Sequence, residues 1–155
     1  MQTLITDFYT AFKNMDAEAM VSCYDDNVVF EDPAFGILLG ERAKNMWRML
    51  ITSQKGKEFI ITFQEVKESD AKASATWEAK YTFSKTSRKV HNIITAQFEI
   101  ADGKIIKHSD HFDLHRWAGQ AMGWTGTLLG WTGFFKKKLH KQTNNLLDRY
   151  LAKNS

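Results

Sequence analysis

The most constraining feature of the sequence is the alternation of residue types between Glu58 and Trp117. In the segment ASATWEAKYTF (residues 73–83), apolar and aromatic residues occupy every second position, and polar residues fill the positions between them. A period of two indicates a strand with one buried face and one face in water. The segments FIITFQEV, VHNIITAQFEI and KIIKHSDHFDL have the same strand character, and "ADGK" predicts a hairpin between the last two. The sequence therefore predicts an antiparallel meander.

Helical patterns flank this meander on both sides. Leu4, Phe8 and Phe12 repeat at helical spacing, and Asp16 has the character of an N-cap for a second short helix. The run NVVFEDP predicts a short strand that stops at Pro33, and a third helix is expected after Gly40. Residues 134–151 predict an amphipathic helix surrounded by lysines. The fold class is therefore expected to be α+β, with helices on one side of the sheet.

Length and composition place limits on the class of protein. A chain of 155 residues fits one domain with one core, and its single cysteine, Cys23, excludes an internal disulfide. We expect a cytoplasmic protein, because the N-terminus lacks the pattern of a signal peptide. Residues 1–103 carry a net charge of −3 and residues 104–155 carry +6. No RNA-binding or helix-turn-helix motif accompanies this asymmetry, so nucleic acid is not an expected partner.

Two adjacent carboxylates, Glu31 and Asp32, stand where the short strand ends before Pro33. A carboxylate set against apolar walls gains proton affinity and can act as a general base. In the alternative interpretation the two acids only cap the turn ahead of the proline, and the residues alone favour it.

A second candidate site is the segment HSDHFD at residues 108–113. Alternation places His108 and Asp110 on the inner face together with Ile106 and Phe112, and places His111 on the opposite face. Polar groups on an apolar strand face need partners or water, because an unpaired buried group costs about 1–3 kcal/mol. The pair could therefore form the floor of a pocket or a satisfied pair in the core, and the residues leave both interpretations open. No metal site is predicted, since neighbouring strand residues point apart and no third ligand has a typical spacing.

The order of helices and strands, with VVFEDP and GKIIKHSDHFDLHRW at its two ends, resembles the nuclear-transport-factor-2-like superfamily. That superfamily includes ketosteroid isomerases, limonene-epoxide hydrolases and SnoaL-like polyketide cyclases. The resemblance implies a curved sheet that helices wrap into a cone, with an interior pocket and a homodimer formed through the outer face of the sheet. It divides the chain into a cone at residues 1–117 and a C-terminal extension at 118–155, packed on the same domain and similar to an extension in a bacterial subgroup.

The resemblance also ranks the possible activities. In ketosteroid isomerases the Asp of EDP is the base and matches Asp32, but the required Tyr and acid fall on Phe8 and Ala96, with Tyr9 about 100° off that face. The hydrolase Arg/Asp pair falls on Trp77 and Ala79. We therefore expect neither of those two activities.

In SnoaL-like cyclases an Asp of the last strand is the base, which implies that role for Asp110, with help from His108. We expect a protein that binds an apolar or aromatic molecule, with isomerase or cyclase chemistry and no cofactor. The candidate catalytic residues are Asp110, His108 and Asp32, and the candidate pocket walls are Trp77, Tyr81, Phe63, Trp47 and Phe112. A non-catalytic binder and a peripheral membrane protein attached through the C-terminal Trp/Lys segment are the alternatives.

The segment GWTGTLLGWTGFFKKK (residues 123–138) contains the tetrapeptide GWTG twice. Its many glycines and threonines interrupt the apolar run, so a transmembrane helix is not expected. We expect a Gly-hinged loop or broken helix whose Trp and Leu side chains cover apolar surface near the pocket or a dimer interface.

Overall fold

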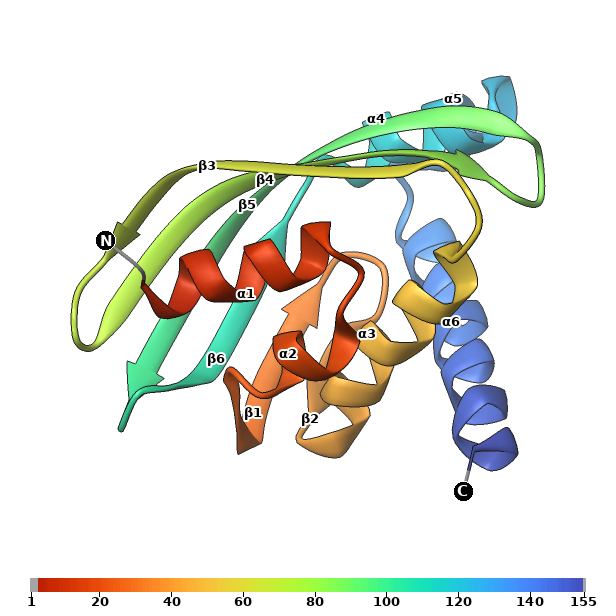
Figure 1. The fold of residues 1–155 in the computed structure, drawn as a ribbon. Helices are drawn as coiled ribbons and strands as arrows, with labels where there is room; N and C mark the ends of the chain where they lie inside the picture. Colours follow the sequence, from red (N-terminus) through yellow and green to blue (C-terminus); the bar gives the residue numbers. More distant parts are fainter. Residues whose placement is uncertain (1–2, 155) are drawn as a thin grey trace.

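The computed structural model describes residues 3–154 and contains one six-stranded sheet in the order β2-β1-β6-β5-β4-β3. The elements follow the chain as α1 (Leu4–Lys13), α2 (Ala17–Val21), β1 (Tyr24–Asp32), β2 (Gly36–Leu39), α3 (Glu41–Gln54), β3 (Phe59–Glu68), β4 (Lys72–Phe83), β5 (Arg88–Ala101), β6 (Lys104–His111), α4 (Leu114–Met122), α5 (Trp124–Leu129) and α6 (Gly133–Lys153). Figure 1 shows α1 under the arch of β3, β4 and β5, with α3 and α6 side by side. The α+β cone fold is confirmed.

The sheet is antiparallel apart from one pair, because β1 runs parallel to β6. In that pair Phe30 lies beside His108, and Glu31 lies beside Ser109. The continuing register brings Asp32 next to Asp110, and residues two apart share a face of a strand. The parallel pair therefore brings the two candidate sites of the sequence together on the inner face.

Alternation predicted most of the buried face correctly. Ala73, Ala75, Trp77 and Ala79 of β4 are all buried, as expected. Ile106 is an exception, because it is exposed while Ile105 is buried. The ladder pairs Glu99 with Lys107 but Ile100 with Ile105, so Ile106 is the extra residue of a β-bulge that turns its side chain outward.

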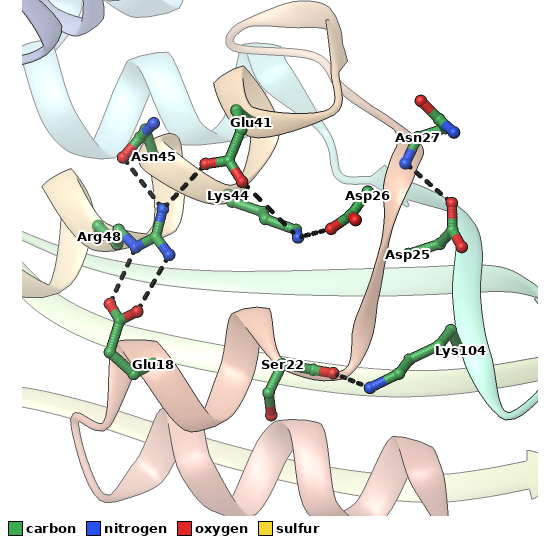
Figure 2. Close-up of polar contacts among 10 residues, drawn as sticks. All are labelled: Glu18, Ser22, Asp25, Asp26, Asn27, Glu41, Lys44, Asn45, Arg48 and Lys104. Carbon is green, nitrogen blue, oxygen red and sulfur yellow. Dashed lines mark hydrogen bonds and ion pairs between the residues drawn. The ribbon is translucent and has the colours of Figure 1, made fainter.

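Ion pairs join α2 to α3 and α3 to strand β1 (Figure 2). Arg48 of α3 bridges Glu18 of α2 and Glu41 at the start of its own helix. The ammonium group of Lys44 lies 2.8 Å from a carboxylate oxygen of Asp26 on β1. Because the carboxylates are exposed, we expect these pairs to orient α2 and α3 more than to stabilise them.

The GWTG segment forms two helices, and neither is buried as a unit. Trp124, Leu128, Leu129 and Trp131 are 50–75% exposed. These side chains are therefore largely exposed in the single chain, and their expected place near the pocket or a dimer interface stays a prediction. Helix α4 begins at Leu114, and the side chain of Asp113 caps it by accepting a hydrogen bond from the amide of Arg116. The strand character expected up to Trp117 therefore ends before this cap.

Gly126, in the first GWTG unit, allows α5 to lie directly against α4. A Cβ atom at this position would collide with the carbonyl group of Ala118. We expect Gly126→Ala to separate the two helices and to lower the free energy of unfolding by about 1–3 kcal/mol. Urea denaturation measures this, with Gly133→Ala as the matched control, because a Cβ at Gly133 meets no atom within 4 Å. Equal losses in both variants would contradict the close-packing role.

Candidate functional site

His108 and Asp110 lie at the centre of a buried hydrogen-bond chain. The Nε2 atom of His108 is 2.8 Å from Oδ1 of Asp110, and its Nδ1 atom is 2.7 Å from the hydroxyl of Tyr24. Trp47 donates to the Tyr24 hydroxyl at 2.8 Å, and Trp77 donates to Oδ1 of Asp110 at 3.3 Å. His108 is 0% exposed and Asp110 is 6% exposed.

One assignment of protons satisfies every member of this chain. Tyr24 accepts the proton of Trp47, so its own hydroxyl proton is directed to Nδ1 of His108. Nε2 of His108 then carries the ring proton and donates to the Asp110 carboxylate. The protein alone therefore satisfies this chain, and a ligand that contacts Asp110 must do so through its second oxygen.

Aromatic side chains fill the space around the imidazole of His108. The ring centroids of five neighbours lie 4.3–6.1 Å from it: Phe98, Phe30, Phe8, Trp47 and Tyr24. The indole of Trp47 stacks on the imidazole with an interplanar angle of 10°. The interior of the cone is thus closely packed at His108.

Tyr9 was wrongly placed away from the inner face. Both Phe8 and Tyr9 are 0% exposed, because α1 lies under the arch of the sheet and buries a wide face. The Tyr9 ring stacks on Phe63 with centroids 5.4 Å apart. Its hydroxyl is the one fully buried side-chain polar atom without a hydrogen-bond partner among residues 3–154. Burial and the Asp110 carboxylate raise the pKa of Tyr9 well above its ordinary value, so it stays a potential donor.

Asp32 is held at the end of β1 by the turn that follows it. Its Oδ1 atom accepts the backbone N–H groups of Ala34 at 3.0 Å and Phe35 at 2.7 Å. This is the turn-capping role that the sequence favoured. No described residue bonds to Oδ2, and this atom is not among the fully buried unpartnered atoms, so it retains contact with solvent.

The environment of Asp32 gives it an unusual proton affinity. Burial raises the pKa of its carboxyl group from 3.8 to about 7. The carboxylate of Asp110 adds to the rise, while the N–H groups of Phe35 and Ala34 oppose it. Asp32 therefore combines a cap, which fixes one oxygen, with a second oxygen that can exchange protons near neutral pH.

The C-terminal helix α6 holds the loop that follows Asp32. The Nε2 atom of His140 lies 2.9 Å from the carbonyl oxygen of Pro33. Thr143 donates to the carbonyl oxygen of Ala34, and Asn144 donates to the carbonyl oxygen of Phe35. The sequence did not predict this contact, because helix and loop are more than 100 residues apart. The spacing of residues 140, 143 and 144 at i, i+3 and i+4 could have indicated one polar face of the helix.

The expected wall residues separate into three groups. Trp47 and Trp77 belong to the buried hydrogen-bond chain of His108 and Asp110. Phe63 stacks on Tyr9, outside that chain. Tyr81 instead accepts a hydrogen bond from Trp117 of α4 at 2.8 Å. Phe112 lines an outer cleft of about 680 Å³ whose other residues include Pro33, His111, His115, Trp131 and Lys136. The structure therefore gathers three of the five expected walls around the candidate site.

The side chains of residues 3–154 do not form a metal site. His111 is exposed on the face of β6 opposite His108 and Asp110, as alternation predicted. No group of three His, Cys, Asp or Glu side chains among residues 3–154 converges as a metal site would require.

Solved structures with this architecture come from several proteins. An LEH-like epoxide hydrolase from M. tuberculosis superposes with a TM-score of 0.58 at 20% identity, over 82% of this chain and 88% of that one. A protein of ketosteroid-isomerase-like fold from Catenulispora acidiphila, solved with trimethylamine, gives 0.62 at 10% identity, over 77% and 94%. TerC, co-crystallised with polyporic acid, gives 0.60 at 18%, over 71% and 88%.

These identities are too low to carry more than the fold, and no curated protein sequence matches the chain. A model of the SnoaL-like domain matches residues 5–108, which is more than half of the chain and includes α1, the Asp32 turn and the strand positions up to His108. The chain therefore belongs to the SnoaL-like family.

Proposed function

We propose that this protein is an acid–base enzyme that binds an apolar carbonyl compound and moves a proton on one of its carbon atoms. Asp32 is the base in this proposal, which rests on its carboxyl group with a pKa of about 7 and one accessible oxygen. A base of this pKa is half ionised near neutral pH. At that pH an appreciable fraction is in the active ionised form, and the form is still basic enough to take a proton from carbon. Isomerase and cyclase reactions of the family share this step.

Asp110 and His108 act as positioning residues in this proposal. The hydrogen bonds that Asp110 accepts from His108 and Trp77 both end on Oδ1, and the Asp110 charge raises the proton affinity of Asp32. The unpartnered hydroxyl of Tyr9 supplies a hydrogen-bond donor for a developing oxyanion. Tyr9 would thereby supply the donor that Phe8 lacks.

The proposal is tested by proton exchange at carbon, which requires no knowledge of the final product. Aromatic ketones and polyketide-like diketones are incubated with the protein in D₂O, and NMR records the loss of α-protons. We expect Asp32→Asn to slow exchange by about 10²–10⁴-fold, as loss of a general base does. The wild-type rate should rise with pH to a plateau above about 7, because ionised Asp32 is the active form.

Glu31→Gln is the matched control, since Glu31 is adjacent in sequence but exposed on the other face. Equal exchange rates in Asp32→Asn and wild type would exclude Asp32 as the base. Ligand binding without any exchange in the wild type would favour a non-catalytic binder. The fully satisfied chain through Tyr24, His108 and Asp110 is the observation that supports this second candidate.

A further inference from the structure

Outside the candidate site, α5 and the first half of α6 carry exposed apolar side chains together with lysines that have no ion pair among residues 3–154. We call this region the α5–α6 surface: Trp124, Leu128 and Leu129 of α5, Trp131 of the connection, and Phe134, Lys137, Lys138 and Lys141 of α6. Trp124, Trp131 and Phe134 are 75%, 72% and 76% exposed. Three large aromatic side chains at this exposure within 11 residues indicate that something covers them.

The lysines continue from the aromatic side chains along one face of α6. Phe134, Lys137, Lys138 and Lys141 have the spacing i, i+3, i+4 and i+7, so they lie in one stripe. The opposite face contains Leu139 and Leu147, which are buried. Residues 114–147 contain five Lys or Arg and no Asp or Glu. Within the described chain none of the lysines 136, 137, 138 and 141 has an ion pair.

A second copy of the chain or an anionic lipid surface could cover this surface, and its positive charge favours the lipid. In a two-fold dimer a patch meets its own copy, so the lysine stripes of two chains would approach each other and repel. An anionic lipid surface provides the opposite sign of charge together with an interfacial region that Trp and Phe prefer. No helix among the described residues is long and apolar enough to cross a membrane, so contact would be with the surface of the bilayer.

We propose that the α5–α6 surface binds the interface of a membrane that contains anionic lipids. Trp124, Trp131 and Phe134 insert at the level of the headgroups, and the lysine stripe contacts the anionic phosphates. Asp148, the next acidic residue along α6, pairs with Arg42 of α3 and so does not oppose the stripe.

Co-sedimentation of the full chain with vesicles tests this proposal. We expect binding to phosphatidylcholine vesicles that contain phosphatidylserine, weaker binding to phosphatidylcholine alone, and loss of the difference at high salt. The combined variant Lys137→Gln, Lys138→Gln and Lys141→Gln should bind about fivefold more weakly for each lysine removed. Lys55→Gln, Lys57→Gln and Lys67→Gln, all exposed positions elsewhere, form the matched control.

The apolar half of the surface has its own variant and its own optical signal. Trp124→Ser, Trp131→Ser and Phe134→Ser together should abolish vesicle binding, whereas Ile37→Ser with Leu39→Ser, at 64% and 62% exposure on β2, should not. Trp47, Trp77 and Trp117 are at most 8% exposed, so a blue shift of the indole emission on adding vesicles reports on Trp124 and Trp131. Thermal melting establishes that each variant is folded.

Three outcomes would overturn the proposal. The first is equal sedimentation with both kinds of vesicle, and the second is loss of binding in the Ile37/Leu39 variant instead. The third is a concentration-dependent dimer that the Trp124/Trp131/Phe134 variant dissociates, because a second copy would then cover the surface.

Discussion

Asp32→Asn is expected to stabilise the folded protein above neutral pH while removing the proposed exchange activity. A carboxyl group whose pKa rises from 3.8 in the unfolded chain to about 7 in the folded chain resists ionisation, and that resistance opposes folding. The asparagine side chain keeps an oxygen to accept the N–H groups of Ala34 and Phe35 and carries no charge. We expect a gain of about 2–4 kcal/mol in the free energy of unfolding near pH 8.

The raised pKa of Asp32 fixes the pH range over which wild-type stability falls relative to the variant. Below about pH 4 the carboxyl group is protonated in both states, so wild type and variant differ little. As the pH rises from about 4 to 7 the unfolded chain ionises and the folded chain does not, and wild-type stability falls by about 1.4 kcal/mol per pH unit. Above the folded pKa of about 7 both states are ionised and the difference is constant.

Urea denaturation of both proteins across this pH range measures the difference directly. Glu31→Gln controls for the loss of a negative charge at the same end of β1. Asp32→Ala controls for the cap, because it also removes the charge but leaves the amides of Ala34 and Phe35 without their acceptor, so it should be less stable than Asp32→Asn at every pH. A gap between wild type and Asp32→Asn that does not grow with pH would refute the raised pKa, and with it the basis for Asp32 as the base.

The sequence predicted the elements that follow a strict period and missed those that do not. The long strands and the helices α1, α3 and α6 were expected, since each repeats its apolar residues over two or more turns or pleats, and the N-cap Asp16 indicated the short helix α2. Strand β2 was missed, because GILL at residues 36–39 has only four residues, begins with a glycine and is followed by Gly40. The bulge at Ile106 leaves no compositional sign, so alternation alone put that side chain on the wrong face.

The candidate site was predictable as two separate pieces. Inner-face positions identified His108 and Asp110, and the strand end identified Asp32, but their adjacency required the parallel pairing of β1 with β6. Tyr24 was missed, because a register irregularity between it and Val29 interrupts the alternation that leads to Phe30 and Asp32. The contacts from α6 to the Asp32 loop join segments that no local pattern connects.

Asp110→Ala is expected to be the most destabilising single change at this site. It removes the acceptor of both His108 Nε2 and Trp77 Nε1, and each buried donor left without a partner costs about 1–3 kcal/mol. With two donors left unpaired, we expect a loss of about 2–6 kcal/mol. Asp110→Asn should cost less, because its amide oxygen still accepts both protons.

A double-mutant cycle decides between the two interpretations of the pair that the sequence left open. If His108 and Asp110 form a satisfied core pair, the losses in His108→Phe and Asp110→Ala should overlap, with a coupling energy of about 0.5–3 kcal/mol in urea denaturation. The proton on His108 Nε2, seen by NMR, should change its resonance in Asp110→Asn and remain protected from exchange. A cost for Asp110→Ala below about 1 kcal/mol would mean that water replaces the carboxylate, since only hydration satisfies both donors so cheaply. The space beside Asp110 would then be an open pocket floor.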